Sequence, residues 1–344
     1  MSTLAWTELF PTKLSFVIFV SYILLFVGQG ILVTASQKSD NQYDYNIITV
    51  VLLTEVFKLI ASSVLYCKDN TPKSLVHNVI ENKKVLGLYF VPAFLYCLYN
   101  NLSFINLSVF DPTTYYLLLQ LRVVVTGILF QVIFSKTLSR KQWLSLVILT
   151  CGCMLKQVNL TETSSDESKT TKLDIGLNGI FILIQIFCSC LAGVYNEYLL
   201  KKQGADVNIF IQNIFMYLDS IVCNVVLLGV RGSLATAFTS DSLVKVFHYK
   251  VLLVMFNNAA IGIVTSFFLK TLNSILKTFA SALELVLTAV LSYVFFSIPI
   301  YLNTVLAIAT VMFAVYLYSQ NPVSNPPKPN KQSEQIGLIK SEEV

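Results

Sequence analysis

The sequence contains little charge and almost no histidine. Charged residues make up 12% of its 344 residues, against about 25% in a typical soluble domain, and there are two histidines. Because this number of charges could not cover the surface of a soluble protein, soluble enzyme folds are excluded. His77 and His248 both fall in expected loops, which leaves no histidine for a metal site inside a membrane.

The sequence also lacks the features of a disulfide framework or a cleaved leader. Its seven cysteines lie mostly in apolar runs, and we expect them to be packing residues rather than metal or redox groups. The first apolar run, 14–33, is too long for a signal-peptide core and precedes no A-x-A cleavage pattern. We therefore expect it to remain as the first helix, and we expect no metal or other cofactor.

Apolar residues, by contrast, are abundant. They make up 55% of the chain, its mean hydropathy is +0.68, and they recur in segments that could cross a hydrocarbon core of about 30 Å. We expect an all-α membrane protein with ten transmembrane helices. The expected spans are 14–35, 46–66, 86–107, 113–134, 138–157, 175–199, 208–230, 250–270, 276–296 and 299–319.

Charges in the loops predict how the chain is oriented. Lysines and arginines cluster after the second, fourth and sixth spans, whereas the loops on the other side are acidic or mixed. By the positive-inside rule both termini are cytoplasmic, and the net charge of +5 belongs to cytoplasmic loops rather than to a nucleic-acid surface. The sequon at Asn159 then lies in a lumenal loop, accessible to N-glycosylation.

The chain contains a faint internal repeat. Aligned without gaps, its two halves pair Asp111 with Asn273 and Thr126 with Thr288. Two repeats of five helices would face in opposite directions because five is odd, and inverted repeats are common in secondary transporters. The expected parts are a cytoplasmic N-terminus at 1–13, a first five-helix repeat at 14–158, a lumenal loop at 159–174, a second repeat at 175–320 and a disordered cytoplasmic tail at 321–344.

A charged residue inside a membrane span costs at least about 2.5 kcal/mol on insertion scales, and eight of those in the expected spans are candidates for a function. Residues that are so costly are expected to face the interior of the bundle and to serve a function there. They are Glu55, Lys58, Arg122, Glu197, Asp219, Lys270, Lys277 and Glu284.

Glu55 and Lys58 stand three residues apart, on one face of the second helix. One interpretation is an internal pair, in which the two charges neutralise each other within the bundle. The other is a pair that lines the cavity, with Glu55 accepting hydrogen bonds from the base or sugar of a ligand. The sequence leaves both interpretations open.

Arg122 has no acidic residue three or four positions away, so its partner must come from another helix or from a ligand. Its planar guanidinium matches a phosphate with two parallel hydrogen bonds. Lys277 begins the ninth helix, where it either contacts the same phosphate or extends to the cytoplasmic interface. These two residues are the expected phosphate contacts.

Tyrosines accumulate near these charges. Most of the 17 tyrosines are expected in the interfacial belts, but those beside Asn100, Asn101 and Asn213 fit a polar cavity better. Rings there would stack on a nucleobase, and amides would read its edge. Asp111 precedes Pro112 and is expected to cap a helix.

Several motifs follow one another along the chain. They are Tyr96-Cys-Leu-Tyr-Asn-Asn-Leu-Ser-Phe, Asp111-Pro-Thr-Thr-Tyr, Gln120-Leu-Arg, Leu138-Ser-Arg-Lys-Gln-Trp, Ala192-Gly-Val-Tyr-Asn-Glu, Gln212-Asn with Met216-Tyr, and the stretch from Lys270 to Lys277. In this order they resemble the nucleotide-sugar transporters. The resemblance extends over about residues 14–320 and is nearest to the carriers of CMP-sialic acid, UDP-galactose and UDP-N-acetylglucosamine.

The resemblance implies a drug/metabolite-transporter fold of ten helices in two inverted five-helix repeats. It also implies a Golgi membrane protein, or one of the ER, that exchanges cytosolic nucleotide sugar for lumenal nucleoside monophosphate, and it leaves room for a homodimer. The substrate-binding residues that it implies are Glu55, Lys58, Tyr96, Asn100, Tyr115, Arg122, Asn213, Tyr217, Asp219 and Lys277.

Departures from the family pattern bear on the substrate. Arg122 stands where the family usually has lysine, Asn273-Ser274 where it has Asp-Asn, and Tyr99 where glutamine is usual. The helix-nine pattern of GDP-sugar carriers is absent, and the segments around Asn196 and Asn213 look nearest to UDP-sugar members. The expected substrate is a UDP-sugar such as UDP-galactose or UDP-N-acetylglucosamine, with CMP-sialic acid as the alternative.

Two functions from other classes compete with transport. A membrane-embedded transferase would need clustered catalytic groups near a membrane face, but the candidates here are scattered singly. A scaffold member of the family that has lost transport would fit the substitutions at Tyr99, Asn273 and Ser274. We expect an antiporter rather than an enzyme, working by alternating access, in which Arg122 and Lys277 from opposite halves clamp the phosphates.

Overall fold

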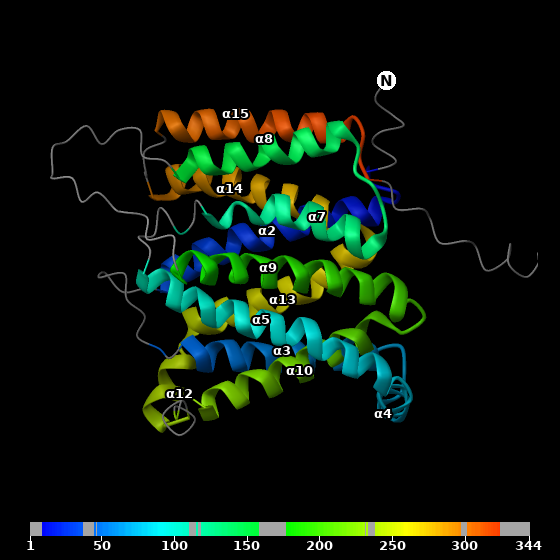
Figure 1. Ribbon diagram of the computed structural model, residues 1–344. Coiled ribbons are helices and arrows are strands. Elements are labelled where there is room, and N and C mark those ends of the chain that lie inside the picture. Colours follow the sequence, from blue (N-terminus) through cyan, green and yellow to red (C-terminus); the bar gives the residue numbers. More distant parts are fainter. Residues whose placement is uncertain are drawn as a thin grey trace, which may run out of the picture.

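The computed structural model is a bundle of long helices that run roughly alongside one another (Figure 1). The predicted helix cap Asp111, the sequon at Asn159 and the predicted lumenal loop lie outside the part that it describes. The described residues are 9–36, 45, 47–109, 115, 118–157, 177–230, 232, 238–296 and 301–323, without some side chains such as that of Asn100.

All regular elements among the described residues are helical. Ten of them are long and coincide, with one exception, with the expected spans to within a few residues. The long helices are α2 (Lys13–Ser36), α3 (Ile47–Cys67), α5 (Lys83–Val109), α7 (Arg122–Phe134), α8 (Arg140–Gln157), α9 (Leu177–Tyr198), α10 (Ile209–Val230), α13 (Tyr249–Thr271), α14 (Ser274–Phe296) and α15 (Leu302–Ser319). The shorter ones are α4 (Pro72–Glu81), the π-helical turn η1 (Leu199–Gln203) and α12 (Ser240–Val246).

The exception is the fourth span, which was expected to start at residue 113 with Arg122 in its middle. Helix α7 instead begins at Arg122. Just before it, the backbone N–H groups of Leu121 and Val123 donate to carbonyls only three residues earlier, at 3.1 Å each. These tight turns interrupt the regular ladder, and such interruptions often mark functional positions in helices. Residues 118 and 119 are also helical, so Arg122 lies at a break between helical segments rather than inside one continuous helix.

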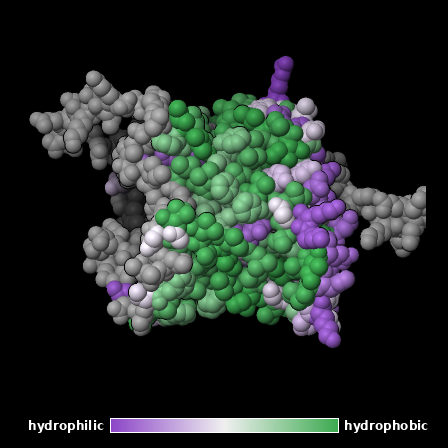
Figure 2. Space-filling view, turned by 60° about the horizontal axis from the view of Figure 1, so that its bottom comes forward, coloured by the Kyte–Doolittle hydropathy of each residue, from purple (hydrophilic) through white to green (hydrophobic). Residues whose placement is uncertain are grey.

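The bundle has the outer surface of a membrane protein. Among the described residues, six helical segments are long and apolar enough to cross a bilayer. Large apolar side chains such as Val132 and Val230 point outward, with 70% and 82% of their surface exposed. Figure 2 shows this apolar surface, with hydrophilic residues gathered along one edge. The protein is thus a multi-pass helical membrane protein.

Helices from the two ends of the sequence pack against each other inside the bundle. The most extensive contacts join α8 with α15, α5 with α9, α2 with α13, and α3 with α10. The largest apolar cluster unites side chains of α2, α7, α8, α9, α14 and α15, including Phe130 and Phe279. Helices α7, α9 and α14 also contact one another, and their shared interior is where the polar residues considered next lie.

The turn between α7 and α8 is tight, in keeping with the three residues that separate the expected spans 113–134 and 138–157. Ser135 adopts a left-handed conformation with φ of 53°, and the backbone N–H of Lys136 donates to the carbonyl of Gln131 at 3.2 Å. The side chain of Gln131 accepts a further bond from the N–H of Leu138 at 2.6 Å. These bonds satisfy backbone groups at both helix ends and return the chain as a helical hairpin.

Candidate functional site

A polar cavity of about 110 Å³ lies between α7, α8, α9 and α14. Arg122 and Lys277 reach it from two helices that are far apart in the sequence. Five hydroxyl groups and two thiols complete most of its polar lining. The lining residues are Gln120, Arg122, Val123, Thr126, Cys153, Ser189, Cys190, Gly193, Val194, Ser274, Lys277, Thr278, Ser281 and Ala282.

The two cations of this cavity are not neutralised by the protein. Neither Arg122 nor Lys277 forms an ion pair or a side-chain hydrogen bond with any residue that the structure describes. Arg122 and Glu197 are electrostatic neighbours of Lys277, but the carboxylate of Glu197 is bound by Lys201. The cavity therefore has excess positive charge in its described lining, and a buried charge of this kind favours an anionic partner.

Helix ends add to this positive potential. Arg122 is the first residue of α7, and Lys277 follows Ser274, the first residue of α14, by three positions. The N-terminus of a helix carries about half a positive charge, which favours anions and disfavours cations. At α14 the carboxylate of Glu197 already accepts from the backbone N–H of Ser274, so the excess positive charge comes mainly from the two side chains.

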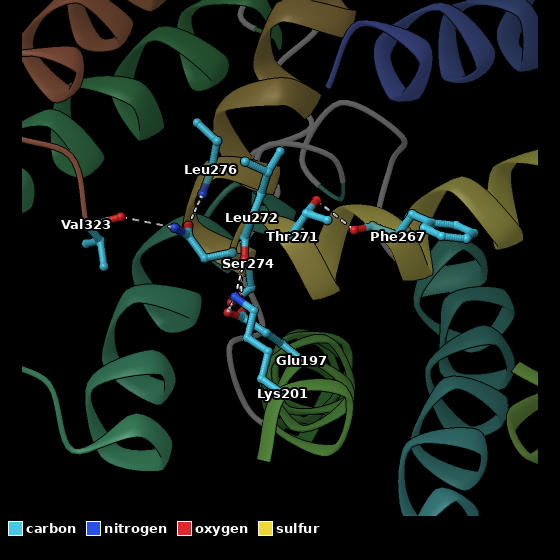
Figure 3. Close-up of polar contacts among 9 residues, drawn as sticks. Glu197, Lys201, Phe267, Thr271, Leu272, Ser274, Leu276 and Val323 are labelled. Atoms are coloured by element: carbon cyan, nitrogen blue, oxygen red, sulfur yellow. Dashed lines mark hydrogen bonds and ion pairs between the residues drawn. The ribbon is translucent and has the colours of Figure 1, made fainter. Parts of the chain in front are cut away.

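A polar network fixes the connection from α13 to α14 (Figure 3). The carboxylate of Glu197 accepts a hydrogen bond from the backbone N–H of Ser274 at 2.7 Å and one from the ammonium of Lys201 at 2.7 Å. Lys201 also donates to the carbonyl of Leu272. The side chain of Asn273 caps the helix by accepting from the N–H of Leu276 at 2.7 Å. The first turn of α14, and with it Lys277, is thereby held in place.

The chain after α15 returns to the same place. The side chain of Asn273 donates to the carbonyl of Val323 at 3.4 Å, and the amide of Gln142 on α8 donates to the carbonyl of Asn321 at 2.9 Å. The N–H of Val323 donates to the hydroxyl of Tyr318 at 3.3 Å. Residues 321–323 thus connect the beginnings of α8 and α14.

A second polar cluster lies between α3, α10 and α13. The ammonium of Lys58 lies 2.7 Å from the carboxylate of Glu55 and 5.5 Å from the ring centroid of Tyr217. Gly262 of α13 faces both partners, since a Cβ there would lie 2.9 Å from Cε of Lys58 and 3.1 Å from the hydroxyl of Tyr217. An ion pair between Glu55 and Lys58, one of the two interpretations left open by the sequence, is present, and a cation–π contact adds to it.

Polar atoms without partners lie on α10 near this cluster. Asn213 and Tyr217 are one turn apart and almost completely buried. The amide nitrogen of Asn213 and one carboxylate oxygen of Asp219 are buried without a hydrogen bond to any described residue. A buried polar atom that is left unsatisfied costs about 1–3 kcal/mol, so these atoms are candidates for contact with a ligand.

The remaining predicted site residues differ in their surroundings. The hydroxyl of Tyr96 lies 3.8 Å from the Cβ position of Gly193, which lines the cavity, but Tyr96 itself is not one of the lining residues. Tyr115 is buried, and its hydroxyl accepts a hydrogen bond from Gln185 at 2.8 Å, which supports a packing role. Asn100 lies in α5, but its side chain is outside the described part of the structure.

Sequence reasoning missed most of the neutral cavity lining. Ser189 and Gly193 stand four residues apart on α9, as do Cys190 and Val194, so two rows of α9 face the cavity. A serine-glycine pair at this spacing is the signal that could have indicated a close approach. Ser274 was noticed only as a departure from a pattern, yet it lines the cavity and its hydroxyl has no described partner.

Within the described residues, no group of three His, Cys, Asp or Glu side chains could hold a metal ion. All seven cysteines lie in this part of the chain and are thiols rather than disulfides. The chemistry available in the cavity is therefore charge and hydrogen bonding, which suit binding of an anion.

Comparison with known proteins identifies relatives that transport anionic ligands. A model of the nucleotide-sugar transporter family matches residues 12–319. The UDP-galactose transporter senju of Drosophila melanogaster is 62% identical over 93% of this chain and 90% of its own length. CMP-sialic acid transporter 1 of Oryza sativa subsp. japonica is 30% identical over 85% of this chain and 89% of its own, and that of Arabidopsis thaliana 30% over 88% and 90%.

A solved structure supports the fold. It matches 91% of this chain and 98% of its own with a TM-score of 0.63, at 13% sequence identity. At this identity the match concerns the arrangement of helices alone.

Proposed function

The chain belongs to the nucleotide-sugar transporter family, and from this premise we propose that it imports a UDP-sugar into the Golgi lumen in exchange for a nucleoside monophosphate. The family makes it a membrane transporter rather than an enzyme. UDP-galactose is the first candidate substrate, because the relative of 62% identity is named as a UDP-galactose transporter. UDP-N-acetylglucosamine is the second.

One observation carries this proposal: Arg122 and Lys277 meet at a single cavity without a counter-anion among the described residues. A diphosphate would supply the missing charge and accept hydrogen bonds from both. The hydroxyl of Ser274, which has no described partner, is available for another phosphate oxygen. A buried phosphate without such partners would be prohibitively costly to desolvate.

The nucleoside end of the ligand would lie toward the second polar cluster. Glu55, Asn213 and Tyr217 offer an acceptor, a donor and a ring, which suit a base that is stacked and read at its edge. Lys58, Tyr96, Asn100, Tyr115 and Asp219 complete the proposed substrate-binding set. Among these, Tyr115 is the weakest member, because Gln185 already occupies its hydroxyl.

The pattern of helix contacts supports an architecture of ten spans in two equivalent halves. Helices α2, α3, α5, α7 and α8 can be matched in order with α9, α10, α13, α14 and α15. Replacing each helix of a contacting pair by its match then gives another pair that is also in contact. The pair α2 and α13 becomes α9 and α5, α3 and α13 becomes α10 and α5, and α14 and α2 becomes α7 and α9; all six pairs are in contact. Inverted repeats of this kind move by rocking one half against the other.

The size of the cavity favours a moving site. Pockets for ligands of drug size usually measure about 300–1,000 Å³, whereas this one measures about 110 Å³. It would hold a phosphate group, but a whole nucleotide sugar requires the halves to separate. The monophosphate would bind the same cations, so the two ligands would compete and exchange. An empty cavity with two unneutralised cations should change sides reluctantly, which favours exchange over uniport.

Loop charges support an orientation with both termini in the cytoplasm. Lys68, Lys83 and Lys84 lie at one end, together with Lys201 and Lys202. The proposed location is the Golgi membrane, with the ER membrane as the alternative. A homodimer is compatible with the family but has no specific support in the contacts described.

Counterflow tests the proposed function. Liposomes containing the purified full-length protein would be preloaded with UMP, CMP or GMP and supplied with labelled UDP-galactose, UDP-N-acetylglucosamine or CMP-sialic acid. We expect UMP to stimulate uptake of a UDP-sugar most strongly. Stimulation by CMP alone would replace this proposal with CMP-sialic acid transport, which the 30%-identical relatives favour. If no nucleotide stimulates uptake or stabilises the protein against heat, the chain is a non-transporting member.

A further inference from the structure

Helix α4 lies at one end of the bundle and is turned out of the direction of the long helices (Figure 1). Thr71 caps it by accepting a hydrogen bond from the N–H of Ser74, and Pro72 occupies its first turn. Two polar contacts tie it to the end of α3: the hydroxyl of Tyr66 lies 3.0 Å from that of Ser74 and accepts from the amide of Asn78 at 3.0 Å. These contacts hold α4 in a fixed position against α3.

The apolar face of α4 is only half covered by the protein. Leu75 and Val79 pack against an apolar cluster that includes Tyr66 and residues of α5, α9 and α10. Val76 and Ile80 follow them by about 100° around the helix and keep 56% and 64% of their surface exposed. They are one turn apart and form a continuous apolar strip that no described residue covers.

Lysines border this strip. Lys73 lies on α4 itself, Lys68 precedes it, and Lys83 and Lys84 follow it, all four exposed. The acidic side chains nearby are fewer, and Glu81 lies 3.7 Å from the imidazole of His77. His77 lies on the side of the helix away from Leu75 and Val79, with 77% of its side chain exposed. The exposed apolar strip thus has Lys73 beside it on the helix, with three more exposed lysines just before and after the helix, and the opposite face is polar.

We propose that α4 is an interfacial helix that binds anionic phospholipid headgroups of the cytoplasmic leaflet. A chain that spans a bilayer brings this helix to the membrane surface. Val76 and Ile80 then enter the acyl boundary, as in other amphipathic helices that lie in the interface. The lysines attract acidic headgroups, and each raises the affinity about fivefold near an anionic surface. The proposal is independent of the substrate, because none of these residues lines the cavity.

Depth-dependent quenching tests the apolar contact. A tryptophan at position 80, made by Ile80→Trp in the full chain, would be compared with His77→Trp in vesicles of phospholipids brominated at a shallow or a deep acyl position. The signal of Trp6 and Trp143 is subtracted with the unchanged protein. We expect strong quenching at position 80, greater from the shallow position, and weak quenching at position 77. Equal, weak quenching at both positions would overturn the proposal.

Lipid titration tests the charge. Phosphatidylserine or phosphatidylcholine would be added to the detergent-purified protein, and thermal unfolding would be followed. We expect phosphatidylserine to stabilise the protein at lower concentration, and the triple variant K73Q/K83Q/K84Q to need well over tenfold more. The control is Lys250→Gln, which removes an exposed lysine at the start of α13, outside the α4 region. A triple variant that keeps the response of the unchanged protein, or a control that loses it equally, would refute specific binding at α4.

Discussion

The molecule contains two groups of partly buried cations, of which the protein neutralises only one. Lys58 has a carboxylate at 2.7 Å and an aromatic ring at 5.5 Å, so the protein itself balances its charge. Arg122 and Lys277 face a cavity instead, and no described carboxylate pairs with either. The protein therefore balances the charge of Lys58 by itself, whereas Arg122 and Lys277 would be balanced only by a bound ligand.

This contrast has an energetic meaning. A buried charge without a partner destabilises a fold, so it persists only where function requires it. A buried pair is less informative, because it contributes little net stability yet is costly to break. The cavity should therefore respond to mutation mainly through ligand binding, and the cluster of Glu55 and Lys58 mainly through stability.

The largest effect is expected at the cavity. Arg122→Ala and Lys277→Ala each remove hydrogen bonds to a charged group, which should weaken UMP binding about 10- to 100-fold. Isothermal titration of the purified protein measures this affinity, and Lys277→Arg, which keeps the charge, is the matched control. If Lys58→Ala weakens UMP binding more than either cavity variant, the roles of the two groups are reversed.

Breaking the internal pair should act on stability. Glu55→Gln leaves the ammonium of Lys58 buried without its carboxylate, which should cost about 3 kcal/mol. The double variant Glu55→Gln/Lys58→Met removes both charges and should recover much of the loss. Thermal unfolding in detergent follows the change. Lys277→Met, which removes an unneutralised cation, should leave the unfolding temperature unchanged or higher; a drop as large as that of Glu55→Gln would contradict the contrast.

The close packing at Gly262 sharpens the comparison. A methyl group there would lie 2.9 Å from Cε of Lys58 and 3.1 Å from the hydroxyl of Tyr217, so Gly262→Ala should cost about 1–3 kcal/mol through overpacking. Gly229→Ala is the control, because nothing lies within 4 Å of its Cβ position. The unfolding temperatures of the two variants measure this cost, and Gly262→Ala should unfold at the lower temperature. Equal temperatures would mean that α3 and α13 separate easily.

The smallest effect is expected at Ser274. Its hydroxyl lines the cavity without a described partner, and rotation about one bond would bring it to a phosphate oxygen. Ser274→Ala should weaken UMP binding about fivefold and leave uridine binding unchanged, since uridine has no phosphate. Ser145→Ala is the control, because that buried hydroxyl donates to the carbonyl of Gln142 in its own helix. Equal losses for UMP and uridine would exclude a phosphate contact.

The sequence was sufficient for an all-helical membrane protein and for the expectation that Arg122 and Lys277 lie in the interior of the bundle, where both line one cavity. Apolar length and charge in a low-dielectric setting are properties of single segments, so the helices and Arg122 and Lys277 could be identified without tertiary contacts. The pair of Glu55 and Lys58 was also predictable, because three residues on a helix bring two side chains together.

What the sequence did not predict depends on contacts between distant segments. Nothing local indicates that Glu197 accepts the N–H of Ser274, or that α7 begins at Arg122 rather than eight or nine residues earlier. The neutral wall of Ser189, Cys190 and Gly193 looks like any apolar helix face until α14 is placed against it. Membrane helices use small residues for close packing everywhere, so their presence alone does not mark a site.

The return of residues 321–323 to the bundle has a practical consequence for handling the protein. Asn321 and Val323 supply carbonyl acceptors to Gln142 and Asn273, at the beginnings of α8 and α14. A fluorescent protein or affinity tag joined after residue 323 leaves both bonds intact. A shortened chain that ends at 319 loses them, and the helix that carries Lys277 would then lose an anchor more than 40 residues away in sequence.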